Sequence, residues 1–449
     1  MFCNQLGTNE VFVRLDAFFE QKREDEENKQ DRAVAGSLPP PRQPTIYLTV
    51  PLFPFITLHS GSKKNTSTWP TKRMLLNELF CTITLKRPVT IVTEPDTAME
   101  PLLHLNMTVD ESDPKSGILV LLRKVRPQWK PEDIKFKIFT EGLTNQLLGC
   151  YVDPPPGEMV LVRIYGKGTE LLVNRKREME TFQMLYAHNC GPQLYCSFQN
   201  GISYEFIRGE VMDEKQLRQP SVYRLVAQEM ARIHSIRPEN GTSARPVLWK
   251  KVSEMLCLVQ DAYRDSSPCR RSRLASAVPH FDVVEREIEA LKKHLSTVKS
   301  QIVLCHNDLL IKNIVYNQAE GCVRFIDYEF ADFNYQAYDI GNHFNEFAGV
   351  NDVDYSLYPS QELQTDWLTT YLQSYKQRLG LEPVVSNKEL QELYVQVCKF
   401  SLVAHFTWGL WALFQARHST INFDFLRYAK ARFNCYFEKK GEYFAMKLP

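Results

Sequence analysis

Hydrophobic and polar residues alternate in two different ways along this chain. Between about residue 113 and residue 207, short apolar runs are separated by turn-forming residues, which is typical of strands. After about residue 213 the apolar residues recur at a spacing near 3.6, which is typical of amphipathic helices. The pattern therefore predicts a β-rich part followed by a mainly helical part.

The β-rich part is predicted to be a small antiparallel α+β lobe. A short helix is expected over residues 117–125, ending before Pro127, and a second one from Glu170 to about His188. The expected strands cover residues 134–139, 146–152, 158–165, 193–198 and 202–207.

The helical part contains six segments with clear helical spacing and one interruption. The interruption is a β island formed by residues 302–305, 313–316 and 323–326. The six helices are expected over residues 221–236, 249–263, 281–298, 361–379, 387–417 and 423–437. A β-rich lobe followed by a helical lobe leaves an interdomain cleft, where ligand sites are common.

The N-terminal region differs from both parts because it shows no sustained period of 2 or 3.6. Charges of both signs fill residues 20–32, and three consecutive prolines follow at residues 39–41. We expect residues 1–104 to be a disordered extension. Residues 105–207 then form the first lobe and residues 208–449 the second.

Composition excludes several classes of protein. The 449 residues carry a net charge of +1, which gives no electrostatic case for a nucleic-acid or membrane-surface partner. The 11 cysteines form no C-x-x-C pair, so neither a zinc site nor a disulfide framework is expected. We found no run of about 18 apolar residues and no secretory signal. These features together predict a cytoplasmic protein without an integral membrane segment.

The strongest chemical signal is the string from His306 to Asn313, with Asp327 at the end of the next strand. Phosphoryl transfer from ATP needs one carboxylate that accepts the proton of the attacking hydroxyl. It also needs hard oxygen ligands that hold Mg²⁺ against the phosphates. Asp308 fits the base, while Asn313 and Asp327 fit the metal. The pattern resembles the H-x-D-x-x-x-x-N signature of protein-kinase-like phosphotransferases.

The first lobe is then expected to bind the nucleotide. Arg163 is a lone cation among apolar strand residues, and it would pair with Glu178 on the next helix, although Glu180 is close enough to leave that choice open. The loop before the second strand would cover the phosphates, and the segment after the last strand would meet adenine. The residues concerned are Gly142, Thr144 and Asn145 in the loop, and Glu205, Phe206 and Ile207 in the segment.

The acceptor is expected to be a small alkylammonium alcohol. The acids Glu329 and Glu346 are close in sequence to Asp327, and Trp408 and Trp411 share one helical face because they are three residues apart. Carboxylates and indole faces attract a small cation by charge and by cation–π interaction. Eukaryotic protein kinases are disfavoured, because the chain lacks G-x-G-x-x-G, V-A-I-K and A-P-E motifs.

At this point the sequence resembles the choline/ethanolamine kinases, and within that family the ethanolamine kinases. The resemblance runs from about residue 105 to 445 and rests on CHNDLLIKNIVY, FIDYEF, YDIGNHFNEF, DVDYSLYP, HFTWGLWAL and FDFLRYAKARF. It implies a bilobal protein-kinase-like fold. It also implies phosphorylation of ethanolamine with MgATP, the first step toward CDP-ethanolamine and phosphatidylethanolamine.

The resemblance also assigns roles to individual residues. Asp308 would be the base, Asn313 and Asp327 the metal ligands, and Arg163 a phosphate contact. The amine pocket would be lined by Glu329, Phe330, Glu346, Trp408 and Trp411. Leu310 stands where choline kinases carry glutamine, and Phe330 where the family usually carries tyrosine, so one hydroxyl is missing from the pocket.

Three alternatives remain open at the level of sequence. One is a choline-preferring or dual kinase, because acids and tryptophans together do not choose between a primary and a quaternary ammonium. Another is an inactive kinase-fold scaffold, against which the trio Asp308, Asn313 and Asp327 argues. The third is an aminoglycoside-type phosphotransferase, which the two tryptophans disfavour. The oligomeric state, a homodimer included, is left open.

Overall fold

The computed structural model describes residues 102–139, 145–153, 157–238, 244–264, 278–419 and 421–449. The chain divides into two units, residues 1–91 and 92–449, and all described residues belong to the second. The expected disordered extension, residues 1–104, therefore lies almost wholly outside the described residues.

The small lobe is built on a six-stranded sheet in the order β1-β5-β6-β4-β3-β2. The five predicted strands are confirmed as β2 (Lys135–Phe139), β3 (Gln146–Tyr151), β4 (Met159–Ile164), β5 (Leu194–Phe198) and β6 (Gly201–Glu205). The sequence did not reveal β1 (His104–Leu105), which pairs in parallel with β5. A strand of two residues is too short to give a periodic signal in the sequence. The expected lobe boundary, between residues 104 and 105, falls inside this strand.

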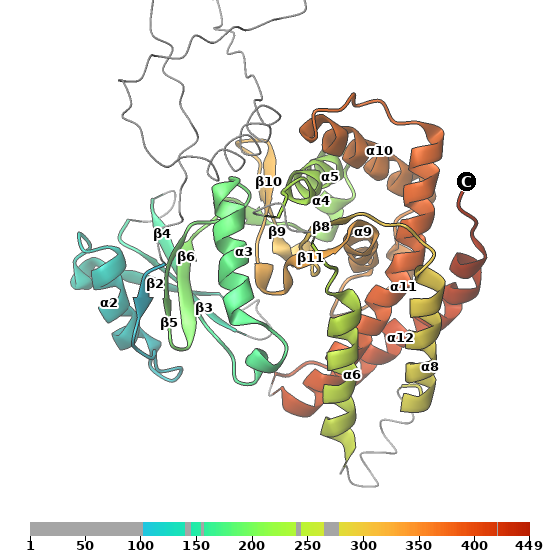
Figure 1. Ribbon diagram of the computed structural model, residues 1–449. Helices are drawn as coiled ribbons and strands as arrows, with labels where there is room; N and C mark the ends of the chain where they lie inside the picture. Colours follow the sequence, from blue (N-terminus) through green and yellow to red (C-terminus); the bar gives the residue numbers. More distant parts are fainter. Residues whose placement is uncertain (1–101, 140–144, 154–156, 239–243, 265–277, 420) are drawn as a thin grey trace, which may run out of the picture. The chain divides into compact units, whose positions relative to one another are not determined.

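Two helices cover the two faces of this sheet, as Figure 1 shows for α2 (Pro114–Val125) and α3 (Arg175–Ala187). Strand β4 is buried on both faces, and its side chains alternate between them. Val160 and Val162 pack in the cluster that contains the α2 residues, whereas Leu161 packs in the cluster that contains the α3 residues. Arg163, two residues beyond Leu161, therefore points toward α3.

Helix α3 begins later than the predicted Glu170. Thr169–Leu171 forms a separate 3-10 turn, and the α-helix starts after Asn174, whose side chain accepts a hydrogen bond from the backbone N–H of Arg177. An asparagine at this position satisfies one of the N–H groups that a helix N-terminus leaves without a partner. Arg175 and Arg177 therefore lie in the first turn of α3.

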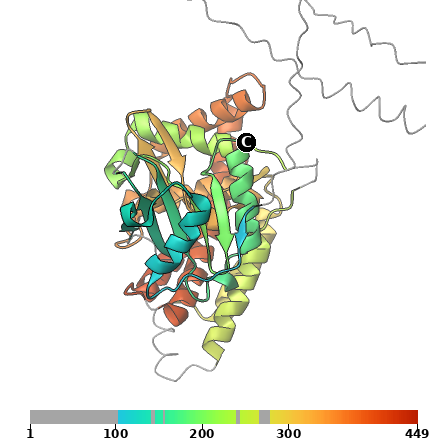
Figure 2. The same ribbon diagram turned by 90° about the vertical axis from the view of Figure 1, so that its left-hand side faces the viewer.

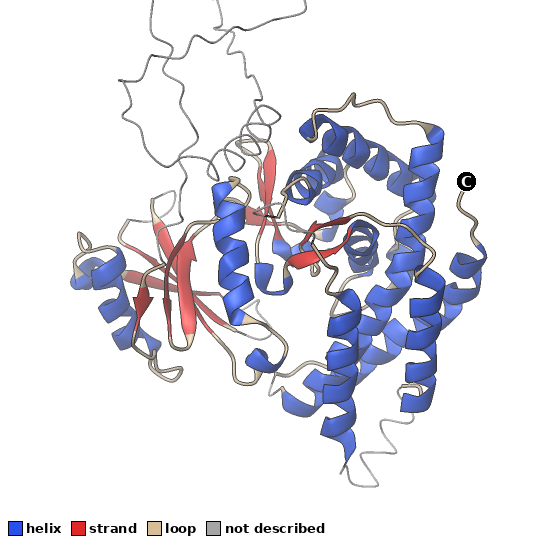
Figure 3. Cartoon of the chain, in the orientation of Figure 1, coloured by secondary structure: helices blue, strands red, loops and turns tan. Residues whose placement is uncertain are grey.

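The large lobe is mainly helical (Figure 3), and all six predicted helices are present. They are α5 (Pro220–His234), α6 (Leu248–Arg264), α8 (Phe281–Leu295), α10 (Gln361–Arg378), α11 (Asn387–His418) and α12 (Phe425–Ala445). The structure adds a one-turn helix α4 (Glu214–Leu217) and the ten-residue helix α9 (Gln336–Asn345).

Helix α9 escaped prediction because every one of its residues is buried, so it has no polar face. It packs closely against α11. A Cβ at Gly341 would lie 2.9 Å from the backbone N of Ser401 and 2.9 Å from the carbonyl O of Val397. Glycine at this position is what lets the two helix backbones approach.

Helix α11 is long and apolar enough to cross a membrane by length and composition, and it is the one such helix in the part of the chain that is described. The apolar spacing in the sequence predicts this helix but does not identify it as a candidate membrane span. Within its most apolar window, 94% of the residues are buried inside the protein. Figures 1 and 2 show it among the other helices of the large lobe, as a core helix would be.

The three strands expected in the β island are present as β8, β9 and β10, and they belong to two separate sheets. Strand β8 (Ile302–Cys305) pairs with β11 (Asp332–Tyr335). Strand β9 (Ile314–Asn317) lies between β10 (Cys322–Phe325) and β7 (Glu210–Val211). The partners β7 and β11 are short and partly polar, which hid them in the sequence.

The eight cysteines among the described residues are all free thiols, and six of them are buried. No disulfide therefore forms among the cysteines that the structure describes.

Candidate active site

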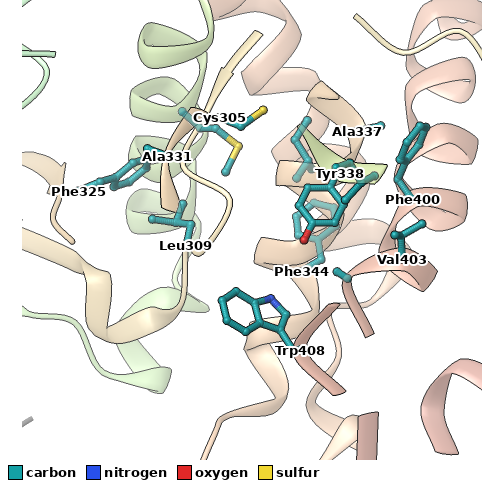
Figure 4. Packing of buried hydrophobic residues seen from close by; sticks show 14 of the residues in the cluster. Cys305, Leu309, Phe325, Ala331, Ala337, Tyr338, Phe344, Phe400, Val403 and Trp408 are labelled. Carbon is teal, nitrogen blue, oxygen red and sulfur yellow. The ribbon is translucent and has the colours of Figure 1, made fainter. Parts of the chain in front are cut away.

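The loop that carries Asp308 begins where β8 ends and is anchored on buried side chains at both sides. Cys305 and Leu309 are fully buried, and Figure 4 shows them among the other core side chains near Phe325, Tyr338 and Trp408. Asn307, between these anchors, has a left-handed backbone with φ 66°. Such a conformation is uncommon for a residue other than glycine and needs support from its surroundings.

Asp339 of α9 supplies that support. Its carboxylate accepts hydrogen bonds from the backbone N–H groups of His306 (2.9 Å) and Asn307 (2.7 Å). His234 of α5 bonds to the same carboxylate through Nε2 at 2.9 Å, and its Nδ1 lies 2.7 Å from the hydroxyl of Tyr371. Burial opposes ionisation of Asp339, but the hydrogen bonds from the His234 side chain and the His306 backbone keep its pKa below the usual value.

His306 has a structural role in the loop. Its Nδ1 faces the backbone N–H of Asp308 at 3.3 Å, and its Nε2 faces the carbonyl of Ile326 at 2.9 Å. Because an N–H can only donate and a carbonyl can only accept, the ring must carry its proton on Nε2. Burial lowers the pKa of His306, in agreement with this neutral form. The ring thus ties the Asp308 loop to the strand end that precedes Asp327.

Asn313 lies next to Asp308. Its side-chain N–H donates to the backbone carbonyl of Asp308 at 2.9 Å. The backbone carbonyl of Asn313 accepts from the backbone N–H of Ile326 at 3.0 Å. The first bond fixes the amide so that its nitrogen faces the loop. Its oxygen is then turned away from the loop as a neutral hard ligand atom.

Asp308 is partly exposed, but its surroundings disfavour its charged form. Desolvation is the largest cause, followed by the negative charges of Glu346, Asp327 and Glu329, and together they raise the pKa of Asp308 well above the usual value. A carboxyl group with a raised pKa is a stronger base once ionised. Perturbed carboxyl groups of this kind are common at functional sites.

Asp327 follows β10 with a left-handed backbone, φ 64° and ψ 62°. Its Oδ1 is buried 3.1 Å from Nη1 of Arg163 but accepts no hydrogen bond from the described residues. A buried carboxylate oxygen that accepts no hydrogen bond from the described residues, together with the oriented amide oxygen of Asn313, is a donor set that suits Mg²⁺. The residues present therefore fit the metal that the sequence analysis expected.

Arg163 pairs with Glu178, which settles the choice that the sequence left open. Their side chains are buried and lie 3.0 Å apart, and Arg163 also donates to the hydroxyl of Tyr204. Glu180 instead pairs with Arg177 on the same helix. The arrangement brings a strand cation and a helix acid together beside Asp327.

The residues expected to contact ATP are described in part. Gly142 and Thr144 lie outside the described residues. Asn145 accepts from the backbone N–H of Gly166 and donates to Glu329 at 3.1 Å. Near the expected adenine site, the rings of Phe139 and Phe206 stack with centroids 6.3 Å apart.

The aromatic residues expected to hold the amine lie together. The rings of Phe330 and Trp408 are 5.7 Å apart, and those of Trp408 and Trp411 are 5.6 Å apart, all edge to face. The indole N–H of Trp408 donates to Asn342 at 2.7 Å, which fixes that ring. The structure adds Phe425 and Tyr428, whose rings lie 5.7 and 6.5 Å from that of Trp411.

A cavity of about 40 Å³ lies behind two of these rings. Phe330 and Trp408 form part of its wall, together with Asn307 and the α6 residues Lys251 and Met255. The ammonium of Lys251 is 5.9 Å from the centre of the Phe330 ring.

Both acids that were expected to face the amine already have cationic partners. Glu346 is 3% exposed and bonds to the buried guanidinium of Arg432, which also donates to Tyr428 at 2.9 Å. Glu329 bonds to Arg175 at 3.1 Å. The structure thus places Glu329 in a cluster of charges against the small lobe, whereas Glu346 lies beside the aromatic rings.

Sequence reasoning missed several residues of the site. Asp339 was quoted only as part of a string, and His234, Arg175 and Arg432 were not considered. These four residues share one property, which is that they act on another side chain or on backbone groups. For Phe425, Tyr428 and Arg432 a signal was present, because they fall in the string FDFLRYAKARF.

A loop carboxylate, an oriented amide and a second carboxylate at the junction of a β-rich and a helical lobe are typical of phosphotransferases of the bilobal kinase type. A family model described as choline/ethanolamine kinase matches residues 136–437. The chain is 49% identical over 348 residues to ethanolamine kinase 1 of Homo sapiens, covering 77% of this chain and 76% of that protein. It is 50% identical over 346 residues to ethanolamine kinase 2 of Homo sapiens, covering 77% and 86%. The chain belongs to the choline/ethanolamine kinase family.

Solved structures agree with this assignment. An ethanolamine kinase of Plasmodium vivax matches with a TM-score of 0.64 and 27% identity over 74% of this chain and 90% of that one. A choline kinase of Cryptosporidium parvum matches with a TM-score of 0.60 and 27% identity over 73% and 95%. The protein-kinase-like fold expected from the sequence is confirmed.

Proposed function

We propose that this protein transfers the γ-phosphoryl group of ATP to the hydroxyl group of ethanolamine. The observation that carries the proposal is the intact arrangement of Asp308, Asn313 and Asp327. The loop bonds described above hold all three together, and relatives about 50% identical are ethanolamine kinases. The product would be phosphoethanolamine, which enters the CDP-ethanolamine route to phosphatidylethanolamine.

Asp308 is the general base of this reaction. Its carboxylate orients the substrate hydroxyl and accepts its proton as the oxygen attacks phosphorus. Cations bound nearby, including the substrate ammonium, would lower the pKa of Asp308 from its raised value and so favour the ionised base. Asn307 and Asp339 hold the loop so that this carboxylate stays in place.

Asn313 and Asp327 would hold Mg²⁺, which when bound neutralises charge on the phosphates. Arg163 contributes a fixed positive charge beside them, because Glu178 and Tyr204 keep its guanidinium in one position. Gly142, Thr144 and Asn145 are assigned to the loop that covers the phosphates.

We assign nucleotide binding to the lobe of residues 105–207 and catalysis and amine binding to residues 208–449. At the junction, the backbone N–H groups of Glu205 and Phe206 donate to the carbonyls of Gln193 and Met159. Ile207 is therefore our candidate for the backbone contact with adenine. Glu205 and Phe206 would shape the same segment.

The ammonium group would lie against the faces of Trp408, Trp411 and Tyr428, with Glu346 beside them. Ring faces attract a cation by about 0.5–2 kcal/mol each, depending on how far it is desolvated. Glu346 shares its charge with Arg432, so it contributes hydrogen-bond acceptors rather than a full unpaired charge. Glu329, which the sequence assigned to the amine, is bonded to Arg175 and is a weaker candidate.

Choline phosphorylation is a second candidate. The observation that favours it is that both acids expected to face the amine are already paired with arginines. A quaternary ammonium offers no N–H donor, so it gains little from carboxylates and much from aromatic faces. A pocket whose acids are paired with arginines suits such a group as well as a primary ammonium. The choice of ethanolamine rests on the relatives.

We place the enzyme in the cytoplasm. The free state of the eight described cysteines is consistent with a reducing compartment. A homodimer is compatible with this function.

The test is product formation followed by phosphorus NMR. Purified protein with MgATP and ethanolamine should form ADP and phosphoethanolamine in equal amounts. Asp308→Asn should bind MgATP with similar affinity but lose at least about 100-fold in kcat, because the base acts in the transition state. Consumption of ATP without phosphoethanolamine, or a normal kcat for Asp308→Asn, would contradict the proposal.

A further inference from the structure

Helix α3 and the turn after it hold the segment that follows Asp327 at three points. The hydroxyl of Tyr328 donates to the carbonyl of Cys190 at 3.1 Å. Arg175 bonds to Glu329 at 3.1 Å, and Arg177 bonds to Asp332 through Nε at 2.9 Å and Nη2 at 2.8 Å. Figure 1 shows α3 as the helix of the small lobe that faces the large lobe.

Arg175 is fixed from several sides. Its guanidinium stacks on the ring of Tyr165 at 3.8 Å, and its Nη2 donates to Thr169 at 2.6 Å. Its Nη1 lies 2.9 Å from Glu178 and 3.1 Å from Glu329. A planar guanidinium can serve two carboxylates at once in a way that a lysine ammonium on a flexible stem cannot.

The position of Arg175 matters because charges are crowded here. Glu178, Asp327 and Glu329 bring three carboxylates together, and Arg163 lies 3.0, 3.1 and 3.9 Å from them. Without a second cation, Arg163 would be the guanidinium that has to serve all three. Arg175 takes up the second oxygen of Glu178 and the carboxylate of Glu329, so Arg163 can remain beside Asp327.

We propose that Arg175 and Arg177 are positioning residues for the metal-binding carboxylate of Asp327. They act on the residues immediately after it, through Glu329 and Asp332, and so hold the turn that gives Asp327 its left-handed backbone. The inference rests on the proposed function in one respect, which is that Asp327 binds Mg²⁺. A displacement of a reacting group by about 1 Å can cost about 100-fold in rate, so support at this point has a kinetic consequence.

The test compares Arg175→Gln, Arg175→Lys and Arg177→Gln with the control Lys176→Gln. Lys176 lies between the two arginines, but its side chain is 86% exposed and pairs loosely with Glu180. Calorimetry would measure the affinity for ADP with Mg²⁺ and, separately, with a chelator. Thermal unfolding would report whether each variant is folded.

Arg175→Gln is expected to weaken MgADP binding about 10-fold or more and to leave metal-free ADP binding within about twofold, since the metal site is what moves. The KM for MgATP should rise and kcat should fall, with the KM for ethanolamine nearly unchanged. Arg177→Gln should have a smaller effect of the same kind, because its ion pair is more exposed. Arg175→Lys should recover part of the loss by keeping the charge.

Two results would overturn the inference. One is that Arg175→Gln and Arg177→Gln bind MgADP as Lys176→Gln does. The other is that affinity falls equally with and without metal, which would mean a general loss of structure or a direct phosphate contact. If Arg175→Gln does not fold, Arg175→Lys and Arg177→Gln carry the test. If wild-type protein lacks ethanolamine-dependent turnover while the metal-dependent loss persists, the proposed function fails and this inference stands.

Discussion

Replacing Asp339 with asparagine removes the support of the catalytic loop while keeping the shape of the side chain. The carboxylate is fully buried and accepts from His306, Asn307 and His234 at 2.9, 2.7 and 2.9 Å. An asparagine has one acceptor oxygen, so its NH₂ group must face one of these donors.

The magnitude follows from these three bonds. A donor left without an acceptor in a buried site costs about 1–3 kcal/mol. The two remaining bonds lose their charge assistance, at about 1 kcal/mol each. We therefore expect Asp339→Asn to lower the free energy of unfolding by about 3–5 kcal/mol. We also expect kcat to fall about 100-fold in the protein that remains folded, because Asp308 is displaced.

The assay is urea unfolding with steady-state kinetics on the same samples. Asp261→Asn is the control, because its carboxylate is exposed and pairs with Arg264 on the same helix. That change should alter the free energy of unfolding by less than about 0.5 kcal/mol. If Asp339→Asn were as stable as this control and kept a normal kcat, our account of how the loop is held would be refuted.

Three further predictions follow from the site and its surroundings. The raised pKa of Asp308 predicts an acidic limb in the pH profile of kcat/KM above the usual aspartate range. Glu346 is the charge that contributes most to the raised pKa of Asp308, so Glu346→Gln should move the acidic limb to lower pH. A limb at the same pH as in wild type would contradict the assignment of that limb to Asp308. Trp411→Leu should raise the KM for the amine several-fold with the KM for ATP nearly constant, which initial-rate kinetics would show. Burial lowers the pKa of His343 from its usual 6.5 to about 4, so the protein should lose up to about 3 kcal/mol of unfolding free energy as the pH falls through that window. Urea unfolding of His343→Gln should show a smaller loss over the same range.

Much of the fold could be predicted because its elements carry their own local signal. Strands such as β4 and β6 and helices such as α5 and α10 were located to within a few residues, since their apolar positions repeat at a recognisable period. The elements that escaped are those whose existence depends on distant partners. Helix α9 is buried all round, and β7 and β11 are stabilised by pairing with β9 and β8.

The site divides in the same way. Asp308, Asn313 and Asp327 could be proposed from the sequence because phosphoryl transfer requires those residue types at that spacing. Arg175 could not be found in this way, because its role depends on its bond to a carboxylate 154 residues away. For Glu329, proximity in sequence suggested the amine pocket, but the fold directs its side chain to α3 and the small lobe instead.

The central claim is tested most directly by measuring kcat/KM for ethanolamine and for choline with the same purified protein and saturating MgATP. The account predicts that kcat/KM is clearly higher for ethanolamine than for choline. Turnover of either amine should depend on Asp308. A preference for choline would mean that the aromatic pocket, and not the resemblance to ethanolamine kinases, decides the substrate. The absence of turnover with either amine by folded protein would contradict the proposed function.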